Sequence, residues 1–317
     1  MTAASLSALW TLQLPVLQVL ATLLAAPLCA LLRGRALPWL LTLVASAGAF
    51  VVSLALLVSV SEQGPVQYAM GDWAPPVGIV FRIDAMNAFV LAIISGMSTA
   101  TLLYARRSLE AEIAARDHPL FYTAYLLCLT GLLGITSTGD AFNFFVFLEI
   151  SSLSTYTLVA MGSRRDRRAL TAAFRYLVMG TIGATFYLIG VGFLYVITGT
   201  LNMADLAERL QGQGDTTVVP VAFAFILIGL GLKAAVMPLH AWLPNAYAYA
   251  PTAVTVFLAA TATKAAVYGM MRFLFTVFGL EFSFEVNVLP YIFMPLALFA
   301  VFAASAVAVW QQDIKRM

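Results

Sequence analysis

Residues 233–251 read KAAVMPLHAWLPNAYAYAP, so a lysine, a histidine and three prolines follow one another at the end of a long apolar run. Pro238 lacks a backbone N–H and therefore ends or kinks a helix. A broken helix inside a membrane is tolerated where it is buried in protein or lines a wet cavity, and such breaks mark ion sites in transporters. The segment predicts a helix, a break and a second helix, with Lys233 before the break and His240 beyond it. The alternative for His240 is a histidine at the membrane interface near Trp242, bonded to a carbonyl.

The whole chain shares this apolar character. Of its 317 residues, 62% are hydrophobic and 10% are charged, whereas a soluble domain has about 45–50% apolar and about 25% charged residues. The bilayer is therefore the expected solvent. The net charge of +2 is spread along the chain, which excludes the dense basic face of a nucleic-acid-binding protein. The 2 cysteines and 2 histidines are not clustered, so no metal and no cofactor is expected, and any redox centre would come from a partner.

Nine apolar stretches are long enough to form helices of the roughly 20 residues that cross a bilayer. The sequence therefore predicts an all-α, polytopic transmembrane helix bundle of about nine spans, with a broken seventh helix. The predicted spans are 14–32, 37–60, 84–105, 120–137, 141–161, 171–198, 219–239, 252–278 and 289–310.

Lys and Arg fall mainly on one side of these spans. They follow spans 1, 3, 5 and 9, and Arg82 and Arg209 are the exceptions in the loops on the other side. Because cytoplasmic loops retain positive charge, we expect a multi-pass cell-membrane protein with its N-terminus outside and its C-terminus in the cytoplasm.

Two outer loops have different predicted structures. Residues 61–81 hold three prolines and three glycines, which is typical of an irregular surface cap. Residues 203–210 place apolar side chains at i, i+3, i+4 and i+7 behind Asn202, a favoured capping residue. This second loop is predicted to contain a short interfacial helix.

Three charged residues, Glu149, Lys233 and Lys264, lie deep inside predicted spans. Ionisable groups there are costly and are functional hypotheses by default. In a low-dielectric site a lysine loses its proton more readily, while a nearby carboxylate opposes that loss. A mixed pair can thus be held close to proton exchange, as a proton relay requires. The alternative is a structural ion pair that joins two helices.

Other polar and small residues have simpler interpretations. Arg175 is expected to extend its long side chain toward the inner surface, Arg82 and Asp84 are candidates to pair with each other, and Asp140 is expected to cap span 5. Serines near Glu149 are expected to bond to their own helix backbone or to hold water. Glycines in span 6 predict close helix contact. The serines near Glu149 are Ser151, Ser152 and Ser154, and the glycines of span 6 are Gly180, Gly183, Gly190 and Gly192.

Four stretches carry a resemblance to a known family. They are GDAFNFFVFLEISSLSTYTLVAMG at 139–162, GLGLKAAVMPLHAWLPNAYAYAPTAV at 229–254, TKAAVYGMMR at 263–272 and QQDIKRM at 311–317. Together they resemble the antiporter-like proton-translocating membrane subunits of respiratory complex I, membrane-bound hydrogenases and Mrp-type cation/proton antiporters. FNFFVFLEISS and TGTLNMADL are most similar to the antiporter D-subunit. By this resemblance Glu149, Lys233, Lys264 and His240 match the family's proton-relay residues.

The resemblance also implies an organisation. It implies a single transmembrane domain over 1–317, in which 1–110 are N-terminal spans 1–3 and 111–278 are the first inverted repeat of the antiporter-like fold, spans 4–8. Residues 279–317 would begin an incomplete second repeat, so the chain would be truncated after the ninth helix, as a fragment or a split gene. The implied partners are other membrane subunits of a multisubunit antiporter or respiratory complex, the lipid bilayer, and protons exchanged with Na⁺ or K⁺.

Two other functions remain open on the sequence alone. The chain could be an NADH:quinone oxidoreductase membrane subunit that contributes to a quinone-reducing enzyme; redox activity in the isolated chain would favour this. It could instead be a structural scaffold, in which case neutral replacements of Lys233 and Lys264 would alter assembly and leave transport unchanged.

Overall fold

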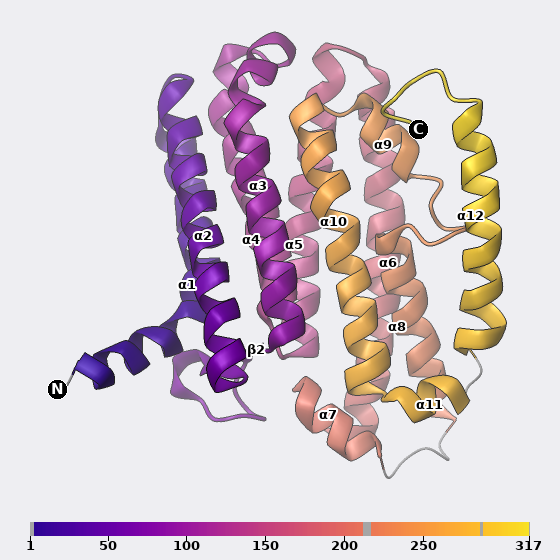
Figure 1. Ribbon diagram of the computed structural model, residues 1–317. Helices are drawn as coiled ribbons and strands as arrows, with labels where there is room; N and C mark the ends of the chain where they lie inside the picture. Colours follow the sequence, from indigo (N-terminus) through magenta and orange to yellow (C-terminus); the bar gives the residue numbers. More distant parts are fainter. Residues whose placement is uncertain (1–2, 212–216, 286–287, 317) are drawn as a thin grey trace.

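The structure is a computed structural model that describes residues 3–211, 217–285 and 288–316. Within these residues, eight helices are long and apolar enough to cross a membrane, and they stand side by side (Figure 1). The predicted transmembrane bundle is therefore confirmed. The helices that form these spans are α1 Ala3–Leu31, α2 Ala36–Gln63, α3 Ala85–Glu112, α4 His118–Ser137, α5 Ala141–Ala160, α6 Arg168–Thr198, α10 Thr252–Arg272 and α12 Met294–Val309. Helix α12 reaches the required length only together with the helical turn before it, as Leu289–Val309.

The predicted seventh span is shorter than expected. Its helix, α8 (Val218–Ala234), ends at Ala235, whose backbone is left-handed (φ 56°). The chain then turns and resumes as α9 (Leu243–Tyr249). The helix–break–helix prediction is thus confirmed, although the helix ends before Pro238 is reached.

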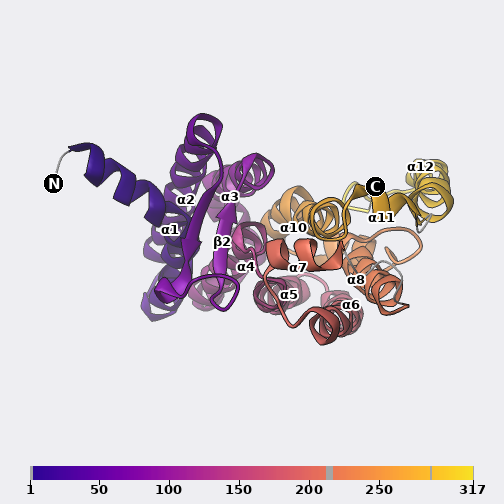
Figure 2. The same ribbon diagram turned by 90° about the horizontal axis from the view of Figure 1, so that it is seen from below.

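The helices pack in two neighbouring groups. Helices α1 to α4 form one group, and α5, α6, α8 and α10 form the other (Figure 2). The two groups are joined by the extensive packing of α4 against α5, and by α10, which contacts α3, α4 and α8. Helix α12 lies at the edge, and none of its described side chains is buried. A π-helical turn, Phe273–Val277, and the short α11 (Leu280–Glu285) follow α10; a second π-helical turn, Leu289–Phe293, precedes α12.

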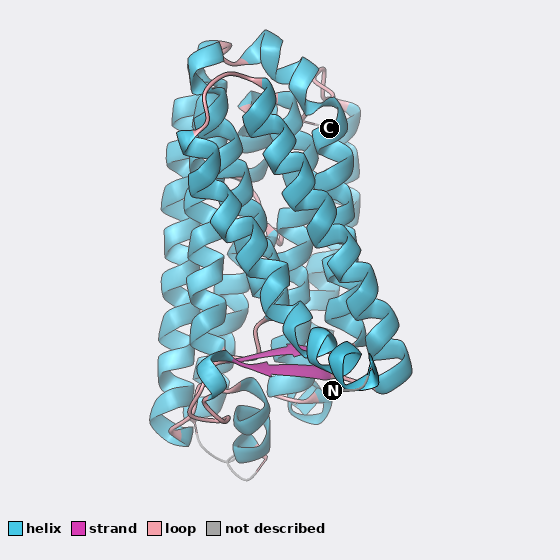
Figure 3. Ribbon diagram, turned by 90° about the vertical axis from the view of Figure 1, so that its left-hand side faces the viewer, coloured by secondary structure: helices cyan, strands magenta, loops and turns pink. Residues whose placement is uncertain are grey.

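The loop between α2 and α3 contains a β-hairpin that was not predicted from the sequence. Strands β1 (Val66–Ala69) and β2 (Val80–Ile83) pair antiparallel across one end of the bundle (Figure 3). Phe81 and Ile83 are buried beneath the helices, so the strands are held by packing against the bundle. The expectation of an irregular cap was wrong for these residues. Each strand has only four residues, and the six Pro and Gly residues around the strands made the whole loop look irregular.

The short helix predicted in the other loop at this end is confirmed as α7 (Met203–Leu210). The Asn202 side chain accepts hydrogen bonds from the N–H groups of Ala204 and Asp205, at 3.0 and 3.2 Å. Met203 and Leu206 are buried. One end of the bundle is therefore covered by the hairpin and by α7 (Figure 1).

Helices α6 and α8 approach each other through glycines. A Cβ added at Gly229 would lie 2.5 Å from the carbonyl oxygen of Gly183, so neither helix can carry a side chain at this crossing. The close contact expected from Gly183 is confirmed, whereas Gly192 faces open space and that prediction was wrong. The crossing fixes α8, and with it Lys233, against α6.

Candidate functional site

Glu149 and Lys233 meet across the helix interface. Glu149 lies in the middle of α5 and Lys233 in the last turn of α8, and the Lys233 Nζ is 3.6 Å from the Glu149 Oε1. Their side chains are 25% and 7% exposed. Partners from other helices were expected from the sequence, and the structure supplies one for each of these two residues. The contact is a single, long one, and the Glu149 Oε1 accepts no hydrogen bond from the described residues.

Ser152 completes the surroundings of the lysine. The Lys233 ammonium donates a hydrogen bond to the Ser152 hydroxyl, one helical turn beyond Glu149. That hydroxyl in turn donates to the carbonyl of Leu148 at 2.7 Å. The backbone bonding expected of this serine is thus present, together with a role toward Lys233 that its sequence context did not reveal.

A small cavity adjoins Lys233. Its volume is about 30 Å³, and one water molecule needs at least about 10–15 Å³. Hydroxyl groups and the lysine lie on one side, and apolar side chains from α4, α5 and α10 lie on the other. The polar lining residues are Ser151, Ser152, Thr155, Tyr176 and Lys233. The cavity can therefore hold a water molecule within reach of the groups that would exchange a proton.

The break after α8 is stabilised by Trp242. Its indole N–H donates to the carbonyl of Leu232 at 3.0 Å, which also accepts the Ala235 N–H at 3.3 Å, and its ring stacks on Tyr176 of α6, with centroids 4.0 Å apart. A helix end leaves carbonyls without their usual partners, and the Leu232 carbonyl lies directly beside Lys233. Trp242 therefore ties the broken segment to α6, a role that was not predicted from the sequence.

His240 lies in the turn between α8 and α9 and does not join the pair. Among the described residues, its side chain makes no hydrogen bond or ion pair with Glu149 or Lys233, and its buried Nδ1 has no partner. The sequence alternative of a carbonyl-bonded histidine is not what the structure shows at Nδ1. A buried polar nitrogen without a partner is typical of a position that water reaches.

Lys264 is where the structure departs from the expectation of a buried charge. Its side chain is exposed on α10, and Nζ donates only to groups of its own helix, at 2.5 Å to the carbonyl of Ala259 and 3.4 Å to the Thr263 hydroxyl. Val256 and Val267 are exposed on the same helix. Lys264 therefore lies on an uncovered, mostly apolar helix face, apart from the Glu149–Lys233 pair.

A second ion pair corrects the expected pairing of Asp84 with Arg82. Arg272, at the end of α10, donates to both carboxylate oxygens of Asp84, at 2.7 and 2.9 Å. Asp84 also caps α3 through the N–H groups of Met86 and Asn87. Burial alone would raise the pKa of Asp84, but the hydrogen bonds and charge of Arg272 hold it below its usual value.

Two further carboxylates stabilise helix starts. Asp140 caps α5 by accepting the N–H of Asn143 at 2.6 Å, as expected. Glu112, at the end of α3, accepts the backbone N–H of Thr252 at 2.7 Å and its hydroxyl at 2.6 Å. Glu112 thus caps α10 from another helix, which no local sequence pattern indicated.

Comparisons with known proteins agree with this architecture. The N-subunit of the NADH-quinone oxidoreductase of Desulforudis audaxviator is 40% identical over 97% of this chain and 61% of its own length. The D-subunit of the Na⁺/H⁺ antiporter of Alkalihalophilus pseudofirmus is 31% identical over 85% of this chain and 53% of its own. The identity to this N-subunit is higher than to this D-subunit, so these two relatives do not bear out the expected greater similarity to the antiporter D-subunit.

A solved structure and a family model extend the likeness. A chain in the membrane-bound sulfane sulfur reductase, an archaeal respiratory membrane complex, superposes with a TM-score of 0.85 at 32% identity, covering 96% of this chain and 61% of that one. The chain therefore spans roughly half to three fifths of the length of the proteins it matches. The model of the family described as NADH:quinone oxidoreductase/Mrp antiporter, TM, matches residues 138–317. Since this is more than half of the chain, the protein belongs to that family.

Proposed function

We propose that this multi-pass membrane protein is a proton-translocating subunit of a multisubunit antiporter or respiratory complex. In this proposal Glu149 and Lys233 form the relay, and His240 and Lys264 continue it on either side. The observation that carries the proposal is the loose Glu149–Lys233 contact, 3.6 Å long, beside a helix break and a water-sized cavity. A tight, fully bonded pair would hold its proton, whereas this one can exchange it.

The geometry supports a simple cycle. While Glu149 is ionised and close, its charge favours the protonated form of Lys233. When a change in a neighbouring protein of the complex moves Glu149 away, Lys233 is left buried without its counter-charge and releases the proton to water in the adjoining cavity. Ser152, which accepts from Lys233, keeps Nζ directed toward that cavity. Return of Glu149 restores the affinity of Lys233 for a new proton.

The test is Lys233→Met in the assembled complex, with proton movement followed in inverted vesicles by a pH-sensitive dye. We expect transport per assembled complex to fall at least about 100-fold, since proton transfer by a positioned side chain contributes about 10² to 10⁴. Lys315→Met is the matched control, because Lys315 lies beyond the last span. Full transport by the Lys233→Met complex contradicts the proposal, and normal transport with poor assembly supports the scaffold function instead.

The parent complex has two candidates. The 40% identity to an N-subunit over nearly the whole chain favours a respiratory complex that reduces quinone, and the D-subunit relatives favour an antiporter. Affinity purification of the native complex separates them: co-purifying dehydrogenase proteins and quinone reductase activity support the first, and antiporter proteins without redox activity support the second.

The proposed orientation places the α7 and hairpin end outside the cell and Arg164, Arg165, Arg167 and Arg168 in the cytoplasm. A cysteine introduced at Arg167 should react with a membrane-impermeant reagent in inverted vesicles and not in intact cells. A cysteine at Val77, which is 82% exposed beside the hairpin, should show the opposite pattern. Reversed labelling of the two sites would reverse the assigned orientation.

A further inference from the structure

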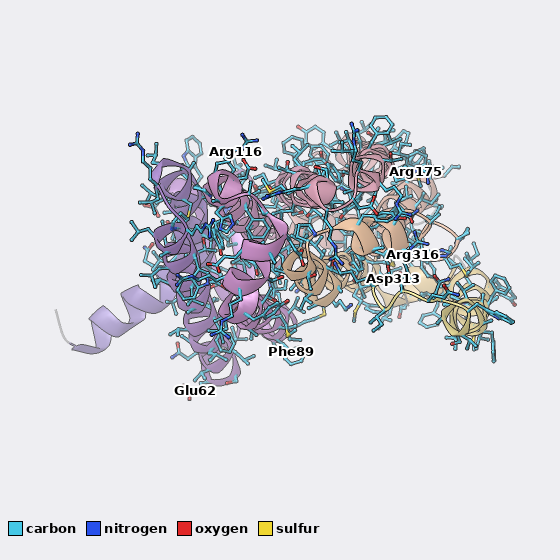
Figure 4. All side chains as sticks on the ribbon, turned by 90° about the horizontal axis from the view of Figure 1, so that it is seen from above. Glu62, Phe89, Arg116, Arg175, Asp313 and Arg316 are labelled. Atoms are coloured by element: carbon cyan, nitrogen blue, oxygen red, sulfur yellow. The ribbon has the colours of Figure 1, made fainter. Side chains whose placement is uncertain are left out.

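A cationic cavity lies where the start of α6 meets α9, apart from the relay. Its volume is about 220 Å³. It lies at the end of the bundle seen in Figure 4, where Arg175 projects at the rim of the molecule. Its lining combines two guanidinium groups with an amide and a phenol: Arg168, Thr171, Ala172, Arg175, Asn245 and Tyr249.

One of the two arginines is held in place by protein contacts. Arg168 donates from Nε and Nη2 to the Asp166 carboxylate, at 2.9 and 2.6 Å. Its guanidinium also lies over the Tyr249 ring, 4.7 Å from the centroid, and Arg316 lies 5.4 Å from the same ring. The charge of Arg168 is therefore compensated by Asp166, and the wall of the cavity that it forms with Tyr249 is fixed.

Arg175 has no such partner. Its exposed side chain makes no hydrogen bond or ion pair with any residue that the structure describes, and the same holds for the side chain of Asn245. Arg175 lies seven residues after Arg168, about 10 Å further along the axis of α6. A long arginine side chain near a helix end can reach the membrane interface, where an anion from outside the chain would supply the counter-charge that the described residues do not.

The surface next to Arg175 identifies the kind of anion. Val178 and Ile182, three and seven residues after Arg175 on the same face of α6, are 40% and 42% exposed. A free phosphate ion would gain nothing from this apolar surface. A phospholipid would place its acyl chains along it and its phosphate oxygens against the planar guanidinium, which binds phosphate in a bidentate manner.

We propose that the cavity between α6 and α9 is a binding site for one anionic phospholipid, whose phosphate is held by Arg175 with Asn245 and Arg168. Basic pockets between helices on the cytoplasmic side of a membrane suit such headgroups. The site does not depend on the proposed transport function. Tyr176, next to Arg175, lines the Lys233 cavity and stacks on Trp242, so an occupied site would hold the part of α6 that supports the helix break.

The test measures lipid retention by the full chain purified in detergent with added phosphatidylglycerol or phosphatidylcholine, using native mass spectrometry. Arg175→Gln should lower phosphatidylglycerol binding about fivefold, since one arginine near the membrane surface contributes about 1 kcal/mol. Arg167→Gln is the matched control: it removes the same charge from the same end, outside the cavity lining, and should leave binding unchanged. Arg175→Lys, which keeps the charge but loses the bidentate guanidinium, should retain part of the binding, between that of Arg175→Gln and the unchanged chain.

Three outcomes overturn the proposal. The first is equal loss in the Arg175→Gln and Arg167→Gln variants, which would indicate a general surface-charge effect. The second is displacement of phosphatidylglycerol from Arg175 by millimolar inorganic phosphate, which would indicate a small-anion site. The third is a photo-crosslinker at position 175 that captures another protein of the native complex in place of lipid, which would make Arg175 part of a protein–protein interface.

Discussion

Two of the long-range ion pairs among the described residues differ in their geometries. Arg272 and Asp84 make two hydrogen bonds of 2.7 and 2.9 Å, and the Tyr268 hydroxyl accepts from the same guanidinium at 3.1 Å. Lys233 and Glu149 share one contact of 3.6 Å, beside a helix end and a cavity. The first pair has its donors and acceptors satisfied, while the second leaves a carboxylate oxygen without a hydrogen bond from the described residues.

Under the proposed function, this difference distinguishes a structural ion pair from a proton-relay pair. Asp84 also caps α3, and Tyr268 donates to the carbonyl of Thr136, so the tight pair joins α3, α4 and α10. Separating Arg272 from Asp84 would break hydrogen bonds that hold the three helices together. The loose pair lies on a broken helix, where a small shift changes the separation of its charges. Whether a buried ion pair is structural therefore depends on how fully its donors and acceptors are hydrogen-bonded. The presence of buried charge alone does not indicate transport.

The largest expected contrast is in transport. Glu149→Gln should lower proton movement per assembled complex about 100-fold, because the relay loses the charge that sets the proton affinity of Lys233. Asp84→Asn, the matching change in the tight pair, should leave it within about twofold. Vesicle assays normalised to the assembled complex measure both. A comparable loss in the two variants would break the distinction.

The free energy of unfolding should show the reverse order, with a larger loss for Asp84→Asn than for Glu149→Gln. Removing one partner of a buried pair costs about 3–5 kcal/mol, and we expect about 2 kcal/mol for Asp84→Asn because this pair is partly exposed. Asn still caps helices well, so the cost reports the ion pair. Unfolding by denaturant in detergent measures it, with Glu110→Gln as the control, because both side chains of its pair with Arg106 on α3 are exposed. Equal costs of Asp84→Asn and Glu110→Gln would contradict the assignment of a structural ion pair.

Trp242→Phe tests whether the helix break supports the loose pair. The change removes the indole donor to the Leu232 carbonyl, which then keeps only the longer bond from the Ala235 N–H, and should cost about 1 kcal/mol of stability, together with reduced transport. Trp39→Phe is the control, since Trp39 also donates to a backbone carbonyl, that of Leu102 at 2.9 Å, far from the site. It should cost a similar amount of stability and leave transport of the folded complex intact. A transport loss in both variants would show that the effect is general.

The smallest expected effect concerns Ser152. Ser152→Ala removes the hydroxyl that accepts from Lys233 and should lower transport about fivefold, the equivalent of one hydrogen bond of about 1 kcal/mol. Ser154→Ala, on the same helix, removes a hydroxyl that donates to the carbonyl of Ile150 in its own helix. Initial transport rates measured side by side give the comparison. If Ser154→Ala is as damaging as Ser152→Ala, the hydroxyl next to Lys233 has no special role.

The features that the sequence predicted correctly depend on neighbouring residues. The caps at Asn202 and Asp140 and the break after Lys233 follow from side chains within a few residues of the backbone that they affect. Span lengths follow from bilayer thickness in the same way. Glu149 and Lys233 were identified from depth alone, and their contact is a tertiary fact that the resemblance only implied.

The incorrect predictions concern contacts that no local pattern encodes. Asp84 was given its sequence neighbour Arg82, whereas its partner is 188 positions away. Lys264 was expected to be buried like Lys233, because a helix in lipid can be apolar all round and its sequence does not tell which face meets protein. The four-residue strands were hidden for a related reason, since burial under the bundle, rather than strand propensity, holds Phe81 and Ile83.

The shortness of α8 has an electrical consequence. With 17 residues against 31 in α6, it is about 26 Å long beside a neighbour of about 46 Å. In the proposed relay, water reaching the end of α8 would bring one aqueous phase part of the way across the bilayer, and the membrane potential would fall over a thinner layer there. A full crossing is worth about 2.3 kcal/mol per charge at 100 mV. A proton that reached Lys233 from that face would cross only a fraction of the field, and voltage would then help to set how often Lys233 is protonated.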